Sequence, residues 1–329
     1  MRRLTFIVLA LAAIYSAYWF VGARALSNGI TVQIGNMQDD GWQFDTSDIG
    51  TRGFPSRFDT TASDLTLATP DKGVVWTAPF VQALSLSYRP NAVILAFPER
   101  QQVTLAGQTF DIGSDGLKAS ATVAASTSLA LANFTAETGP LTVDIDAGQL
   151  LSITSGLVAL RPADTTQNAY DVYADLDDLA PPLALRQLLD PTSNLPATFT
   201  QVTIDANVTL DRPLDRHALT ARDVPRMDAL TLNGMTLTWG TMQLRAQGEI
   251  TIDRAGIPTG RITLDAQNWQ QLLDMAVKIG AIDAGLVQTI RNMAGLLAGG
   301  SNDLSLPVSF QNGLMSVGPI PVGPAPRLR

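Results

Sequence analysis

The chain contains no cysteine among its 329 residues and only one histidine. Without thiols it can form no disulfide, no thiolate metal site, no cysteine nucleophile and no lipid-modified cysteine. The single imidazole, His217, leaves only oxygen ligands for any metal, which excludes the common zinc sites. We therefore expect no metal and no other cofactor.

Basic residues are fewer than acidic ones, with 22 Lys and Arg against 30 Asp and Glu and a net charge of −8. Setting aside Arg2, Arg3 and Arg24 at the N-terminus makes the remainder more acidic still. An acidic chain without basic clusters is unsuited to nucleic acid. The acidic residues are scattered rather than grouped, which is typical of a soluble surface.

Long apolar runs are also scarce, and the one present extends from Leu4 to Val21. Its eighteen residues form a helix of roughly 27 Å, enough to cross the hydrocarbon core of a bilayer. Tyr15, Tyr18 and Trp19 lie near its far end, where amphipathic rings favour the membrane–water boundary. The residues expected to form the membrane anchor are Leu4, Phe6, Ile7, Leu9, Leu11, Ile14, Tyr18, Trp19 and Val21.

Arg2 and Arg3 precede the apolar run, and short positive flanks stay on the cytoplasmic side. The remainder of the chain is then exported, and its lack of disulfides favours a bacterial periplasm. We expect a single-pass protein of the bacterial inner membrane whose body lies in the periplasm. A cleaved signal peptide is the alternative, with Ala23–Arg24–Ala25 as a cleavage site. The apolar run is longer than the roughly 7–15 residues usual for a signal peptide, which favours the retained anchor.

Apolar and polar residues alternate along most of the chain after the anchor. Residues 202–211 place Val202, Ile204, Ala206, Val208 and Leu210 on one face. The same alternation recurs in residues 242–252, 262–266 and 304–310. This periodicity predicts half-buried antiparallel strands in a long meander and a mainly β fold, and it is equally compatible with an open groove and with a closed sandwich.

Turn and helix signals divide these strands. Asp253–Gly256 and Asn312–Gly313 predict turns, and Asn233–Gly234 predicts either a hairpin or a bulge. Gly53–Phe54–Pro55 predicts a stiff corner whose Phe54 packs on the core.

Short helices are expected in the C-terminal half, where they cover the sheet. They comprise residues 183–189, a helix capped by Asn268 and ending at Gly280, and a helix capped by Asp283 and ending at Gly299.

The expected domains are an anchor with its cytoplasmic flank at 1–25, an exported β-rich domain at 26–318 and a proline-rich tail at 319–329. A subdivision of the β-rich domain near 161–168 is the alternative to one continuous architecture.

No catalytic motif is present. His217 lies in a charged segment without a nucleophile elbow, which favours a solvated side chain over a catalytic base. Asp171, Asp175, Asp177 and Asp178 lack the spacing and glycine of a calcium loop. Asp144 and Asp146 share one strand face as a glycosidase pair would, but acids at that spacing are common. We expect no enzyme, with a hydrolase as the minority alternative.

Several short segments resemble one family. Gly41–Trp42, Gly53–Phe58, Leu237–Gly240 and Gly256–Gly260, together with the terminal anchor, are similar to the alphaproteobacterial family called domain of unknown function 2125. That resemblance covers most of the chain and implies no catalytic residues. More loosely, the anchor, the β-rich body and the segment Leu306–Gly313 resemble AsmA-like envelope proteins, which implies a long curved sheet with an apolar groove for lipid.

These observations favour a non-catalytic protein of the cell envelope that binds a hydrophobic ligand such as lipid. The alternative is a structural or assembly module that binds another envelope protein through a sheet edge or the helix at 286–297. The sequence does not assign the ligand-binding residues.

Overall fold

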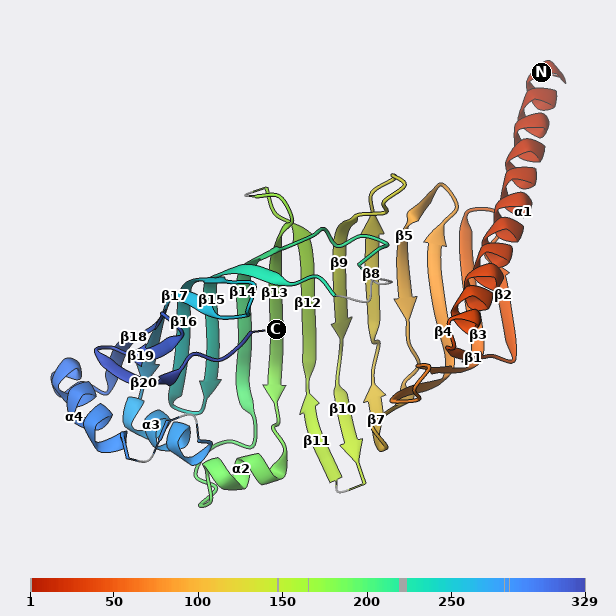
Figure 1. The fold of residues 1–329 in the computed structure, drawn as a ribbon. Coiled ribbons are helices and arrows are strands. Elements are labelled where there is room, and N and C mark those ends of the chain that lie inside the picture. Colours follow the sequence, from red (N-terminus) through yellow and green to blue (C-terminus); the bar gives the residue numbers. More distant parts are fainter. Residues whose placement is uncertain are drawn as a thin grey trace. The chain divides into compact units, whose positions relative to one another are not determined.

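The computed structural model describes residues 2–146, 148–164, 166–218, 224–280, 282–283 and 285–328. Within these residues the fold is mainly β, with antiparallel pairing throughout, one long N-terminal helix and three short helices (Figure 1). The predicted fold class is therefore confirmed. The chain divides into two compact units, which we call unit 1 (Met1–Ala125 and Ala136–Gly148) and unit 2 (Ser126–Thr135 and Gln149–Arg329).

The first element of unit 1 is the helix α1 (Arg2–Asp39). It includes the predicted apolar run and then continues well beyond residue 25 without a break. The helix ends where Gly41 adopts a positive φ of 88°, a conformation that glycine reaches without steric cost.

The strands of unit 1 are short except for two. They are β1 (Gln43–Asp45), β2 (Asp48–Arg52), β3 (Arg57–Ala68), β4 (Val74–Leu86), β5 (Arg89–Ala96), β6 (Arg100–Leu105), β7 (Gln108–Ser114), β8 (Lys118–Val123) and β10 (Leu141–Ile145).

The long strand β4 is shared between two shorter strands. Its first part pairs with β6, from Val74↔Leu105 to Thr77↔Gln102, and its last part pairs with β5, from Gln82↔Ala96 to Leu86↔Arg89. Strand β8 then adds to β5, β7 adds to β6, and β10 adds to β7. On its other edge β4 pairs with β3, which also pairs with β1 and β2.

Unit 2 contains a long antiparallel meander in which each strand pairs with the next from β12 to β20. These strands are β12 (Ser155–Pro162), β13 (Ala169–Leu179), β14 (Phe199–Leu210), β15 (Met227–Trp239), β16 (Met242–Ile252), β17 (Pro258–Gln267), β18 (Asp303–Gln311), β19 (Leu314–Val317) and β20 (Ile320–Pro324). Two further strands are divided between the units: β9 (Leu131–Thr138), which pairs with β12, continues from unit 2 into unit 1, and β11 (Gly148–Ile153) continues from unit 1 into unit 2.

The register of this meander follows the predicted alternation. In β14, Ala206 lies opposite Val172 of β13 and Leu232 of β15, so apolar side chains meet across neighbouring strands. The pairing of β14 and β15 shifts between Asp205 and Ala206, opposite Asn233–Gly234. Asn233–Gly234 therefore forms a bulge inside β15 rather than a hairpin.

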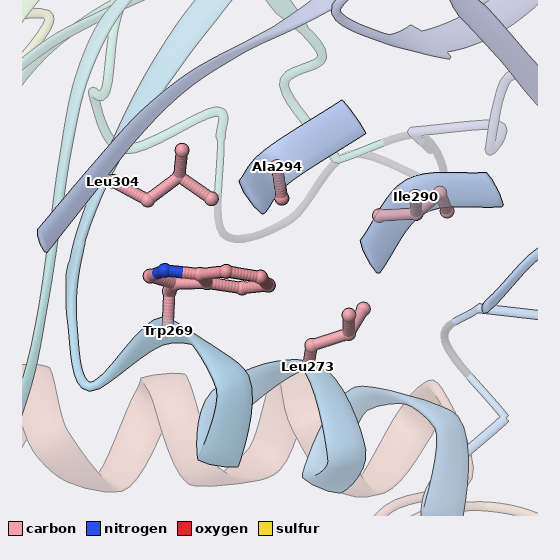
Figure 2. Close-up of a cluster of buried hydrophobic side chains, with 5 residues drawn as sticks. All are labelled: Trp269, Leu273, Ile290, Ala294 and Leu304. Carbon is pink, nitrogen blue, oxygen red and sulfur yellow. The ribbon is translucent and has the colours of Figure 1, made fainter. Parts of the chain in front are cut away.

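The three short helices lie where the sequence predicts them. They are α2 (Leu183–Leu189), α3 (Trp269–Lys278) and α4 (Val287–Ala298). Figure 2 shows Trp269 and Leu273 of α3 meeting Ile290 and Ala294 of α4 and Leu304 of β18 in one buried cluster. The helices thus cover the apolar face of the sheet in unit 2.

Three local expectations are wrong. Asp283 does not cap α4, because the N-cap residue is Leu286, whose side chain forms no capping hydrogen bond; Asp283 Oδ1 instead accepts a hydrogen bond from the Gly285 amide at 2.7 Å. Asn268 does not cap α3 through its side chain, because it adopts a left-handed conformation and its Nδ2 donates to the Thr241 carbonyl at 2.7 Å. The proline-rich end of the chain is not merely an extended tail. Residues 320–324 form β20, and Ile320 packs against the cluster around Trp269.

Candidate functional site

The apolar part of α1 presents its side chains outward. Of the nine predicted anchor residues, Trp19 alone is buried, and the others range from 48% exposed at Tyr18 to 73% at Phe6. Within the described residues, α1 is the one helix long and apolar enough to cross a membrane. An apolar surface of this size is unfavourable in water.

Trp19 instead packs α1 against the strands of unit 1. Its Nε1 donates a 2.8 Å hydrogen bond to the carbonyl oxygen of Arg57, at the start of β3. Its ring contacts those of Phe58 and Phe54, with centroids 5.9 and 5.4 Å away. Gly22, one turn further along, lies so close to Phe58 that a Cβ there would approach the ring to 2.9 Å.

Two tyrosines complete the docking through Ser87, which is fully buried in the turn between β4 and β5. The Tyr18 hydroxyl donates to the Ser87 carbonyl at 2.6 Å, and the hydroxyls of Tyr15 and Ser87 are 3.0 Å apart. The Ser87 amide donates to the carbonyl of Ser56 in the neighbouring turn at 2.9 Å. The helix and the two turns are therefore held together by directional bonds as well as by ring packing.

This arrangement corrects the expected role of Phe54. The corner between β2 and β3 forms as predicted, but Phe54 is 51% exposed and does not reach the core of the sheet. It stacks on Phe20 of α1 with a centroid distance of 5.6 Å. Phe54 therefore packs against α1 rather than against the core of the sheet.

The strands next to this docking point carry apolar residues on both faces. Residues 92–96 of β5 form a continuous apolar run, and Val93 and Ile94 face opposite sides because successive side chains alternate. Val93 lines a cavity of about 270 Å³ between the sheet and α1, together with Tyr18, Gly22 and Phe58. One face of β5 thus lies under the helix.

The other face of β5 forms an open apolar pocket of about 470 Å³, a size within the roughly 300–1,000 Å³ of small-ligand sites. We call it the β5 pocket. Its apolar wall comes from β4 and β5 and includes Leu84, Leu86, Ala92 and Ile94. Ile94 is 44% exposed and Leu86 38% exposed, so these side chains have no complete cover within the described residues.

Two arginines also line the β5 pocket. Arg57 and Arg89 lie opposite Leu86 in the β3–β4 and β4–β5 pairings. The Arg57 Nε is 3.1 Å from Asp59 Oδ1, whereas Arg89 forms no ion pair within the described residues. An apolar wall with a guanidinium at one end suits a chain-like ligand with an anionic head.

A larger cavity of about 1,130 Å³ in unit 1 has a mixed polar and apolar lining that includes five acidic residues. Asp64, Glu99, Asp111 and Asp144 are among its lining residues, so it suits neither an acyl chain nor an anionic head. Asp144 lies directly opposite Asp111 of β7, and Gln102 Nε2 donates to Asp111 Oδ1 at 2.6 Å. Asp146, which the sequence pairs with Asp144, follows the end of β10.

The remaining candidates for chemistry belong to unit 2 and line none of the cavities of unit 1. His217 is exposed in a loop of unit 2, where its backbone amide donates to Asp215 at 2.8 Å. Asp171 pairs with Arg161 and Asn207, while Asp177 and Asp178 accept hydrogen bonds from Ser155 and Thr154. Within the described residues no three His, Asp or Glu side chains form a group that could hold a metal ion.

Within the described residues of unit 2, Asp211 is the carboxyl group whose pKa is shifted most. The side chain of Arg212 donates to its carboxylate and the backbone amide of Arg226 donates at 2.9 Å. These bonds lower the pKa of Asp211 from 3.8 to about 2. The bonds between Asp211 and Arg226 join the residue directly after β14 to the residue directly before β15.

Sequence reasoning missed Ser87, Arg57, Arg89 and the β5 pocket. The apolar run at 92–96 was the available signal, because a strand that is apolar on both faces needs a cover on each side. Which elements cover it depends on the pairing of β5 with β4 and β8, and that pairing follows no local sequence rule.

Comparison with known proteins identifies the family but no activity. No curated protein and no solved structure matches the chain. The model of one family, described as uncharacterized protein conserved in bacteria (DUF2125), matches residues 19–326. The match includes the docking residues Trp19, Arg57 and Ser87 and the whole of the β5 pocket. The chain therefore belongs to the DUF2125 family.

Proposed function

We propose that the protein is anchored by α1 in the bacterial inner membrane, carries its β-rich body in the periplasm and binds a lipid acyl chain in the β5 pocket. In this proposal it is not an enzyme, and it uses no cofactor. The β5 pocket is the observation that carries the proposal.

Three features of unit 1 support a lipid rather than another apolar ligand. The pocket wall is aliphatic, which matches an acyl chain better than a flat ring system. Arg57 and Arg89 supply guanidinium groups that bind phosphate or carboxylate. Leu86 is adjacent to Ser87, which bonds to Tyr15 and Tyr18 of α1, so the pocket begins beside the end of the apolar run at 4–21.

Burial of apolar groups provides the binding energy. Each methylene that moves from water into an apolar site contributes about 0.8 kcal/mol. The pocket is open along one side, so part of an acyl chain stays outside it and the expected affinity is moderate. Exchange of lipid with the bilayer is compatible with such a site.

Native mass spectrometry of the full-length protein, gently extracted in detergent, tests the proposal. We expect lipid to remain bound to the wild-type protein and to be lost from Ala92→Phe and Thr122→Phe, which fill the pocket. Gln108→Phe, at an exposed position of β7 away from the pocket, is the matched control and should retain lipid. Lipid retained equally by all four proteins would rule out the β5 pocket as the site.

One observation in unit 2 favours the second candidate, a module that binds another envelope protein. Leu296 and Leu297 at the end of α4 are 85% and 60% exposed, although Leu286 at its start packs into the core. A photocrosslinking amino acid at position 296 in intact cells would capture one stoichiometric partner if this helix binds a protein. A crosslinker at the exposed position Asp228 serves as the control.

A further inference from the structure

The docking of α1 places three exposed aromatic side chains at one end of unit 1. Phe20 of α1 is 62% exposed, Phe54 in the β2–β3 turn is 51% exposed, and Tyr88 in the β4–β5 turn is 68% exposed. We call these three residues the aromatic tip. Large exposed rings grouped in this way mark an interaction surface.

The contacts with α1 show which residues of the helix lie beside the aromatic tip. Phe54 stacks on Phe20 and meets Trp19 edge to face. Tyr88 follows Ser87, which bonds to Tyr15 and Tyr18. Both turns therefore lie beside residues 15–20, which belong to the apolar run that ends at Val21.

The position of the tip beside residues 15–20 determines its surroundings if α1 enters a bilayer. If residues 4–21 occupy the hydrocarbon core and its boundary, Phe54 cannot remain in bulk water, because it touches a residue of that run. The membrane–water boundary is also the region that aromatic rings favour.

The charges around the tip complement a lipid surface. Arg52 ends β2 and Arg89 begins β5, and both are exposed without an ion pair within the described residues. The nearby Asp59 lies opposite Arg52 and is paired with Arg57. Cationic side chains thus outnumber acidic ones here, in a chain whose net charge is −8.

We propose that the aromatic tip inserts into the outer boundary layer of the bilayer that α1 crosses, and that Arg52 and Arg89 contact lipid phosphates there. Unit 1 is then held at the membrane surface by two turns as well as by its helix. This inference rests on the proposed membrane crossing of α1, but it does not depend on lipid binding in the β5 pocket.

The absence of cysteine allows a direct test by single-cysteine labelling of the full-length protein. Ser56→Cys places a polarity-sensitive fluorophore between Phe54 and the start of β3 while keeping all three rings. Leu9→Cys reports on the helix within the membrane, and Gln108→Cys reports on the opposite end of unit 1. Each labelled protein is reconstituted in vesicles of phosphatidylcholine and phosphatidylglycerol that contain spin-labelled lipid.

We expect quenching at position 56 that is several-fold stronger than at position 108 and weaker than at position 9. Replacing Phe54 and Tyr88 by serine in the Ser56→Cys protein should reduce the quenching towards that of position 108. Replacing Arg52, which does not line the β5 pocket, by serine should reduce its dependence on phosphatidylglycerol.

Two results would overturn the inference while leaving the membrane crossing intact. The first is quenching at position 9 together with equal, weak quenching at positions 56 and 108. The second is efficient disulfide formation between copies of the unlabelled Ser56→Cys protein, with no quenching in its labelled form, which would assign the tip to a second copy of the chain. Absence of quenching at position 9 would overturn the membrane crossing and this inference together.

Discussion

The indole of Trp19 donates its hydrogen bond to the carbonyl of Arg57, across 38 positions of the sequence. Arg57 in turn lines the β5 pocket. The backbone carbonyl of Arg57 therefore accepts a hydrogen bond from the helix, while its side chain lines the candidate ligand site. Loss of the Trp19 contact should affect both the helix and the pocket.

The first prediction concerns the docking of α1. Trp19→Ala removes the buried ring and its hydrogen bond, a change that costs about 3–5 kcal/mol in protein cores. Arg24 is the only trypsin site between Arg3 and Arg52. We expect cleavage after Arg24 in reconstituted protein to accelerate by two orders of magnitude or more, because each 1.4 kcal/mol corresponds to a factor of ten.

Val21→Ala is the control for this experiment, since Val21 is 69% exposed. Trp19→Phe, which keeps a ring but removes the N–H donor, should give an intermediate rate. Equal cleavage of all three variants would show that Trp19 does not hold the helix.

The second prediction separates the two arginines of the β5 pocket. Asp59 already neutralises part of the charge of Arg57, whereas Arg89 is unpaired within the described residues. A hydrogen bond to a charged group is worth about 1.5–3 kcal/mol. Arg89→Ser should therefore weaken binding of phosphatidylglycerol about tenfold or more, with a smaller effect for Arg57→Ser.

Displacement of a fluorescent lipid from the purified protein provides the measurement. Neutral diacylglycerol should bind wild-type protein and Arg89→Ser alike, and Arg100→Ser, in the larger cavity, is the control. A loss of affinity that is the same for both lipids would contradict a role in binding the headgroup.

The third prediction compares two glycines of unit 2. Gly260 in β17 has a φ of 143°, and a Cβ there would lie 2.3 Å from the carbonyl oxygen of Glu249. Gly260→Ala should destabilise the protein by about 1–3 kcal/mol or more, because the neighbouring backbone must move. The readout is the midpoint of denaturant unfolding, followed by tryptophan fluorescence.

Gly295 is the matched position in a helix. It lies on the exposed side of α4, where an added Cβ meets nothing within 4 Å. Gly295→Ala should stabilise by roughly 0.5–1 kcal/mol through helix propensity. Equal effects of the two substitutions would show that the close strand approach at Gly260 is absent in solution.

The fourth prediction is a pH dependence at Asp211. Its folded pKa of about 2 lies below the ordinary 3.8, so the ionised carboxylate favours the folded state. That stabilisation is complete above about pH 4 and disappears as the pH falls towards 2. Asp211→Asn should therefore be less stable than wild type at pH 7, and the difference should vanish near pH 2.

Thermal unfolding across this pH range, followed by circular dichroism, checks the prediction. Asp228→Asn, at an exposed position of β15, should track the wild-type protein throughout. A difference between Asp211→Asn and wild type that is constant with pH would mean that the bonds from Arg212 and Arg226 do not depend on charge.

The sequence predicted the elements of this fold better than their long-range partners. The alternation around Val202 placed β14 correctly because period two directly reflects a sheet with one buried face. Gly299 marked the end of α4 because a left-handed residue there favours glycine. The prediction that Asn268 caps α3 was wrong because its side chain donates to the carbonyl of Thr241, which is distant in sequence.

The candidate site shows the same limit. Trp19 was assigned to the membrane boundary from its neighbours in the apolar run, and its burial depends on the carbonyl of Arg57 and the ring of Phe58. The pocket at Ala92 and Ile94 depends on the pairing of β8 with β5. The strands between them in the sequence, β6 and β7, pair with each other, and β6 pairs with β4 rather than with β5. Tertiary pairing of this kind leaves no periodic trace in the sequence.

The unbroken course of α1 from Arg2 to Asp39 has a mechanical consequence for unit 1. A domain that is joined to its membrane anchor by a flexible linker can change its height and orientation relative to the bilayer. Here the segment that would enter the membrane is the same rigid rod that is bonded to β3 and to the β4–β5 turn. Unit 1 would therefore rotate and tilt only together with its anchor, at a constant height, and would meet ligands by lateral diffusion in the plane of the membrane.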